Sequence, residues 1–156
     1  MINIKTISAH CDIPCKIYDP VIIQIASLSV VRLTDLIIDI GSKDDSLSNQ
    51  NQMTRIIVEK EKQASIVKDE TRIIWGDYFK EPQLKSFPET HSLVHSIMLA
   101  ASKCKQEINR TNAETLVNIV NQFSEIFWTT KSIKIKRVVS PYPPSMEMVL
   151  PVLEDA

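Results

Sequence analysis

Apolar residues recur at intervals of three and four over much of the chain, which places them on one face of an α-helix. The clearest stripe follows Thr111 and consists of Leu116, Ile119, Val120, Phe123, Ile126 and Phe127. A helix opened by Pro88 and Glu89 carries a second stripe, made of Val94, Ile97, Met98, Ala101 and Cys104. Both patterns predict amphipathic helices that bury one face.

Two more helices are predicted earlier in the chain. Residues 52–70 carry a stripe that consists of Met53, Ile57, Lys60, Ala64 and Val67. Lys60 interrupts the apolar side chains of this stripe, and its long side chain can extend to place the ammonium in water. Residues 21–40 are apolar on nearly every side, which is typical of a helix buried on most of its surface. Four helices of similar length with short connections indicate an all-α fold, an antiparallel up-down four-helix bundle.

Local signals predict where these helices begin and end. Asp19 followed by Pro20 predicts an N-cap and a first helical residue. Gly41 predicts a left-handed stop at the end of the first helix. Thr111 with Glu114 has the spacing of a capping box for the last one.

Two segments fall outside the helical pattern. Residues 75–88 are rich in aromatic residues and proline, and we expect a packed connection there. Residues 132–156 hold half of the eight prolines, Pro141, Pro143, Pro144 and Pro151. We therefore expect a C-terminal tail that is extended or disordered.

Composition excludes several classes of function. The 156 residues, 44% apolar and 24% charged, fit one globular domain, and a net charge of -1 offers no basic field for nucleic acid. Two glycines, Gly41 and Gly76, are too few for a phosphate-binding loop. No uninterrupted apolar stretch approaches the roughly 18 residues of a membrane span. Three cysteines, an odd number, argue against a disulfide framework and favour the cytoplasm.

The most informative residues precede the first helix. His10, Cys11 and Cys15 place an imidazole and two thiols within six residues, with Pro14 between the cysteines. This spacing matches neither a zinc ribbon nor a thioredoxin-like redox pair. Soft thiolates with nitrogen donors suit zinc, copper or nickel. The alternative is that the cysteines are small buried hydrophobes and the histidine is solvated.

Four motifs resemble one family along residues 10–131. The first is His10-Cys11-x-x-Pro14-Cys15-x-x-Tyr18-Asp19-Pro20, which is similar to the N-terminal nickel hook of nickel-dependent superoxide dismutases. The others are Trp75-x-Asp77-Tyr78-Phe79-Lys80-x-Pro82, Phe87-Pro88-Glu89-x-His91 and Ile126-Phe127-Trp128-x-Thr130-Lys131. The hook motif is highly specific because in that family it is tied to the mature N-terminus.

The resemblance implies a cofactor, its ligands, a substrate and a processing step. Nickel is the implied cofactor, held by the His10 α-amine, the Cys11 amide and the thiolates of Cys11 and Cys15, with the His10 imidazole as the axial ligand of nickel(III). Superoxide is the implied substrate, and it is converted to oxygen and hydrogen peroxide. A peptidase that cuts before His10 makes residues 1–9 a propeptide, residues 10–131 the enzyme domain with its hook at 10–18, and residues 132–156 a tail. A homohexamer in the cytoplasm is also implied.

The same resemblance assigns roles around the metal. Tyr18 and Tyr78 match two tyrosines beside the open face of the metal, and we expect them to orient ligands and gate substrate. Asp12 and Asp77 are the expected hydrogen-bonding neighbours.

Three positions depart from the pattern of some family members. Ala26 occupies the position at which some family members have an acidic residue that hydrogen-bonds the axial histidine. Gln63 occupies the position of the arginine that pairs with this acidic residue. Lys16 replaces a glycine of other hooks, and its charge can attract anionic superoxide.

Two other interpretations are open. A nickel-binding or nickel-delivery protein without turnover is the alternative to the enzyme. His91 and His95 lie four residues apart on a predicted helix, the spacing of a two-histidine metal face. No third ligand is placed to complete that site, so surface or interface histidines are the favoured interpretation.

Overall fold

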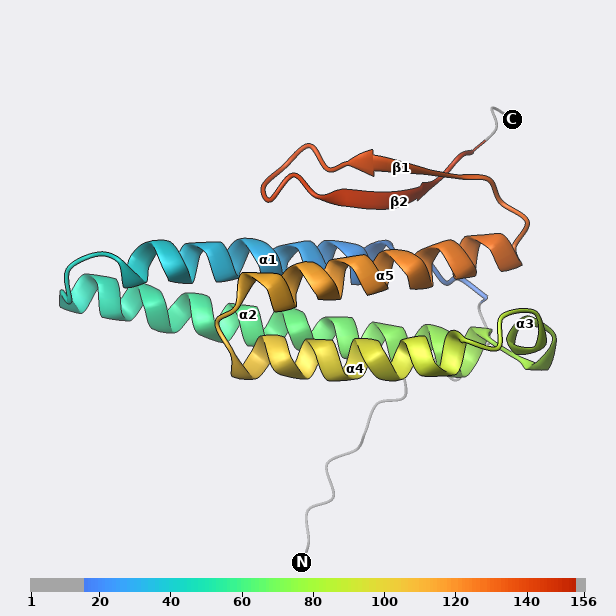
Figure 1. Cartoon of the computed structure of the whole chain (residues 1–156), viewed down its shortest axis with the longest axis horizontal. Helices are drawn as coiled ribbons and strands as arrows, with labels where there is room; N and C mark the ends of the chain where they lie inside the picture. The colour runs from blue at the N-terminus through green and yellow to red at the C-terminus, as the bar shows by residue number, and fades with distance from the viewer. Residues whose placement is uncertain (1–15, 154–156) are drawn as a thin grey trace, which may run out of the picture.

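The computed structural model describes residues 16–153 and contains four long helices arranged as an antiparallel bundle (Figure 1). They are α1 (Val21–Gly41), α2 (Leu47–Ile73), α4 (Thr90–Gln106) and α5 (Arg110–Thr130). Helix α1 packs against α2 and α5, and α4 packs against the same two helices from the other side. The predicted all-α four-helix bundle is confirmed.

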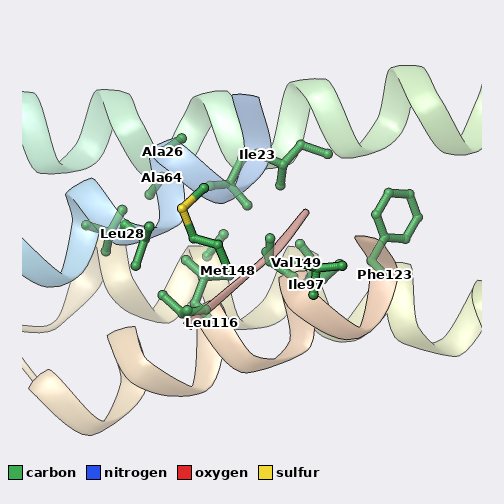
Figure 2. Close-up of a cluster of buried hydrophobic side chains, with 14 of the residues drawn as sticks. Ile23, Ala26, Leu28, Ala64, Ile97, Leu116, Phe123, Met148 and Val149 are labelled. Carbon is green, nitrogen blue, oxygen red and sulfur yellow. The ribbon is translucent and has the colours of Figure 1, made fainter. Parts of the chain in front are cut away.

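The predicted apolar stripes form the core between these helices. One cluster runs through all four helices and includes Ile23, Ala64, Ile97, Leu116 and Phe123, each at most 2% exposed. Figure 2 shows these side chains meeting between the ribbons. A smaller cluster of Ile37, Ile40 and Ile56 fills the end where α1 turns into α2. Burial of the stripes is the main favourable term for this fold.

Two of the predicted helix ends are correct only in part. The Asp19 carboxylate accepts a hydrogen bond from the Val21 N–H at 2.8 Å, but the N-cap is Pro20 and not Asp19, so α1 begins one residue later than predicted. Gly41, however, has no positive φ and remains helical, so the predicted left-handed stop is wrong. Instead α1 ends at Ser42, whose hydroxyl donates to the Asp39 carbonyl at 2.8 Å.

The start of α5 also differs from the prediction. The cap is the Asn109 side chain, which accepts from the Asn112 N–H at 3.1 Å, and Thr111 already lies inside the helix. Glu114 pairs with Arg110 instead of closing a capping box. Asparagine is as good a cap as serine or threonine, so the neighbouring motif misplaced the start by two residues.

The connection after α2 is helical. A π-helical turn, η1 (Ile74–Tyr78), follows α2 directly, and a short helix, α3 (Glu81–Ser86), precedes α4. The segment is packed, as expected, because Ile74 and Phe79 lie in the main core. Single π-helical turns are often found at functional sites, and this one carries Tyr78.

Lys60 is the largest fully buried side chain among the described residues, at 1% exposed. Its ammonium does not reach water but donates to backbone carbonyls at the end of α4: those of Cys104, of Lys105 at 3.3 Å and of Glu107 at 3.1 Å. The positive group thus satisfies carbonyls that a helix C-terminus leaves unpaired. Burial lowers the pKa of Lys60, and burial raises the pKa of the neighbouring Cys104 thiol to about 11.

The C-terminal tail is an ordered β-hairpin on the bundle. Strand β1 (Ile135–Val139) pairs antiparallel with β2 (Glu147–Pro151), with Arg137 opposite Val149. Figure 1 shows the hairpin lying over α1 and α5. Of the two predicted states of this tail, the extended one is confirmed. The tail is not disordered, because Met148 and Val149 are buried in the main core.

Helix α1 is long and apolar enough to cross a membrane, judged only by its length and a mean hydropathy of 1.9. Its polar interruptions are too few to lower that average. Half of this apolar window is buried inside the bundle, and a core helix meets the same criterion.

The carbonyl contacts of Lys60 can be tested by substitution. We expect Lys60→Met to lower the free energy of unfolding by about 1–3 kcal/mol, because the carbonyls at the end of α4 would be buried without a donor. Lys62→Met is the matched control on the same helix, since Lys62 is exposed, and it should change stability by less than about 0.5 kcal/mol. Urea denaturation measures both, and equal values would contradict the capping role.

Candidate active site

The start of α1, the π-helical turn η1 and the end of α5 lie at the same end of the bundle (Figure 1). The predicted ligands His10, Cys11 and Cys15, together with Asp12, lie outside the described residues. The chain enters the described part at Lys16 and reaches α1 through Tyr18. The geometry of the candidate site is therefore described through the residues around Tyr18.

Tyr18 and Tyr78, predicted from separate motifs, are brought together. Their ring centroids lie 5.9 Å apart with a 52° angle between the planes. Tyr78 also contacts Phe79 at 5.2 Å and Phe127 at 4.8 Å between ring centroids. These distances are typical of favourable aromatic pairs. Contacts with these aromatic rings fix the side chain of Tyr78, and Tyr18 packs against it.

Thr130 determines how the hydroxyl of Tyr78 is used. The Tyr78 and Thr130 hydroxyl oxygens lie 2.7 Å apart, and the Thr130 hydroxyl also lies 2.7 Å from the Phe127 carbonyl. A carbonyl can only accept, and a hydroxyl has one proton, so Thr130 donates to Phe127. Tyr78 must then donate to Thr130. The lone pairs of the Tyr78 oxygen are left to accept a hydrogen bond from another group.

Positive charge lies beside these rings. The Lys131 ammonium is 5.0 Å from the centre of the Tyr78 ring and 5.1 Å from that of Phe127, within the range of a cation–π contact. Lys80 donates to the Gly76 carbonyl at 3.0 Å on the same turn as Tyr78. The motif that contains Thr130 and Lys131 gives neither residue a role, and the fold shows that both contact Tyr78.

Lys16 is exposed and has a φ of 60°, in the left-handed region. Glycine reaches this conformation without strain, whereas a residue with a Cβ does so at some cost. The conformation explains why a glycine suits this position.

The structure shows the surroundings of the two positions that depart from the family pattern near the axial ligand. Ala26 is 2% exposed and belongs to the main core. The Gln63 side chain donates to Glu59, four residues earlier on α2, at 2.7 Å. Asp77, expected as a hydrogen-bonding neighbour of the tyrosines, is exposed on η1.

His91 has a partner that does not involve metal. The Trp75 indole N–H donates to His91 Nδ1 at 3.1 Å, and the two rings meet edge to face. His95 is exposed on α4. Within residues 16–153, no three histidine, cysteine or carboxylate side chains come together as a possible metal site.

Comparison with known proteins agrees with the motifs and the bundle. A family model described as nickel-containing superoxide dismutase matches residues 5–131. The chain belongs to the nickel-containing superoxide dismutase family. The superoxide dismutase [Ni] of Streptomyces coelicolor is 34% identical over 126 residues, which cover 81% of this chain and 91% of the relative. That of Streptomyces seoulensis is 34% identical over 125 residues, covering 80% and 90%.

Solved structures of Ni-containing superoxide dismutase share the fold. One with nickel ligation of the oxidized state has a TM-score of 0.70 at 33% identity, covering 79% of this chain and 99% of that one. A native structure has a TM-score of 0.68 at 33% identity, covering 78% and 99%. Membership of the nickel-containing superoxide dismutase family confirms the predicted enzyme class and the nickel cofactor. The hairpin lies beyond the matched residues.

The contact of Tyr78 with Thr130 predicts a stability difference. Thr130→Val removes the acceptor of the Tyr78 hydroxyl, and we expect a loss of about 0.5–1.5 kcal/mol in the free energy of unfolding. Thr129→Val is the control, because the exposed Thr129 hydroxyl contacts only the Glu125 carbonyl of its own helix. Denaturation of both variants measures the difference, and a neutral Thr130→Val would exclude the assigned bond.

Proposed function

We propose that this chain disproportionates superoxide to oxygen and hydrogen peroxide at a nickel ion held by its N-terminal hook. The observation that carries the proposal is the contact of Tyr18, the last hook residue, with Tyr78 on η1. Cys15 precedes Tyr18 by three residues, and three residues span at most about 11 Å. Connectivity alone therefore keeps a proposed nickel ligand near the tyrosine pair.

The donor set suits nickel. His10, Cys11 and Cys15 supply two thiolates, an imidazole and, after cleavage before His10, an α-amine. The α-amine has an ordinary pKa of about 7.7–8.0, so a metal can displace its proton near neutral pH. When bound, nickel supplies the one-electron nickel(II)/nickel(III) couple, which anionic sulfur donors bring into a usable range. Zinc has no redox chemistry to offer here.

The chain's own side chains handle substrate and protons. Peroxide formation consumes two protons, and the Tyr78 oxygen, with its own proton directed at Thr130, can accept a hydrogen bond from a water or a protonated group at the opening. We assign Tyr18 and Tyr78 to substrate gating and Asp12 to orientation of the hook. The ammonium groups of Lys16 and Lys131 attract an anionic substrate to this end of the bundle.

Processing and assembly belong to the same proposal. A peptidase that cuts before His10 would remove residues 1–9 as a propeptide and expose the amine ligand. We place the mature enzyme in the cytoplasm, where thiols stay reduced, as a homohexamer.

The requirement for cleavage can be measured directly. We expect nickel-loaded protein that begins at His10 to dismutate superoxide, and the uncut chain to be inactive in the same assay, because its His10 nitrogen is an amide. Nickel content of both preparations is the control. Equal rates would contradict the role of the amine.

A carrier without turnover is the alternative function, and electron paramagnetic resonance separates the two. We expect the enzyme to show a nickel(III) signal that Cys11→Ser and Cys15→Ser each abolish, while Cys104→Ser, which changes a buried thiol in the core, retains it. A carrier holds silent nickel(II) in every variant. A signal that survives in either hook variant would remove that thiolate from the ligand set.

A further inference from the structure

Strand β2 is bound to the bundle through its outer backbone edge. The register pairs Ser140 with Met146 and Lys134 with Val152 through backbone hydrogen bonds, so Glu147 and Val149 turn their backbone groups away from β1. In a two-stranded sheet those groups lie on the free edge of β2.

Two helix amides occupy that edge. The Gln24 amide of α1 donates to the Val149 carbonyl at 3.0 Å and accepts from the Val149 N–H at 2.7 Å. The Asn121 amide of α5 donates to the Glu147 carbonyl at 2.8 Å. Gln24 thus bonds to both backbone groups of one residue, as a neighbouring strand would.

These contacts are buried and specific. Gln24 and Asn121 are each 2% exposed, and a buried amide without a partner is costly. The side chains of Met148 and Val149 belong to the main core cluster together with Ile23 and Ile97, and Figure 2 draws them there. Outside the core, Arg137 bridges Glu125 of α5 at 2.7 Å and Glu147 at 3.2 Å. The hairpin is therefore fastened to one helix by Gln24 and to the other by Asn121.

The two fastened helices are those that meet at the tyrosine pair. Tyr18 lies six residues before Gln24, where the chain enters α1. Thr130, which holds the Tyr78 hydroxyl, is the last residue of α5 and leads into the hairpin. A single strand bonded to both helices sets the spacing of α1 from α5, and through them the position of Tyr18 against Tyr78.

We propose that the hairpin is a brace for the active site, with Gln24 and Asn121 as positioning residues that act through α1 and α5. Its effect on turnover rests on the proposed dismutase function, whereas its effect on the tyrosine geometry does not. Because the hairpin follows the residues that the family model matches, the brace is an addition to the matched domain.

Fluorotyrosine labelling provides a test that needs no metal. The chain has three tyrosines, so ¹⁹F spectra assigned with Tyr→Phe variants report separately on Tyr18, Tyr78 and, within the hairpin, Tyr142. Gln24→Met removes both amide bonds at nearly constant volume, and Asn121→Leu is a milder second variant that removes one. Ile37→Ala is the control, because it opens the smaller core cluster at the far end of α1 and lowers the melting temperature without touching the hairpin.

We expect both amide variants to move the Tyr18 and Tyr78 resonances and to lower dismutation by nickel-loaded protein roughly tenfold, as small misplacements of catalytic groups do. Ile37→Ala should lower the melting temperature and leave both readouts unchanged. The brace is overturned if only the Tyr142 resonance moves and turnover matches that of Ile37→Ala. If nickel-loaded wild-type protein that begins at His10 shows no dismutation, the proposed function fails, and the fluorine spectra still decide whether the hairpin positions the tyrosines.

Discussion

Burial of α1 is the constraint on which the rest of this structure depends. It is the most apolar of the four long helices, and so one neighbour cannot cover it. Helix α2 covers one side, α5 covers a second, and β2 bonds to both α1 and α5. Because Tyr18 comes shortly before α1, each contact that fixes this helix also affects the position of Tyr18 beside Tyr78.

Buried polar side chains define the geometry that apolar packing leaves open. Apolar contacts tolerate small sliding of one helix against another, whereas a hydrogen bond at 2.7–3.0 Å does not. Lys60 ties α2 to the end of α4, Gln24 ties α1 to β2, and Thr130 ties α5 to Tyr78. Each of these side chains satisfies or positions a group that would otherwise be unpaired or mobile, and each joins two elements that are distant in sequence.

Periodicity was sufficient to predict the four helices, because a stripe at a spacing of three and four has one stable arrangement once it is buried. It could not predict details set by tertiary contacts. The carbonyls that bind Lys60 lie more than forty residues away, so its burial looked like an interruption. The hairpin was hidden because prolines dominate residues 141–151 and because its anchors, Gln24 and Asn121, lie in the helices. The pairing of Tyr18 with Tyr78 followed from the family resemblance, whereas the role of Thr130 needed the fold.

The hairpin shares the core with Ala26, one of the departures from the family pattern. Ala26 lies in the core cluster that also contains Ala64 of α2 and Met148 of the hairpin, as Figure 2 shows. Burial of a charged carboxylate among apolar side chains costs several kcal/mol unless the charge is paired. The small apolar side chain of Ala26, which is 2% exposed, therefore suits this core. Two residues before Ala26, the side-chain amide of Gln24 binds α1 to the backbone of Val149, so this part of α1 is held by the hairpin as well as by the other helices.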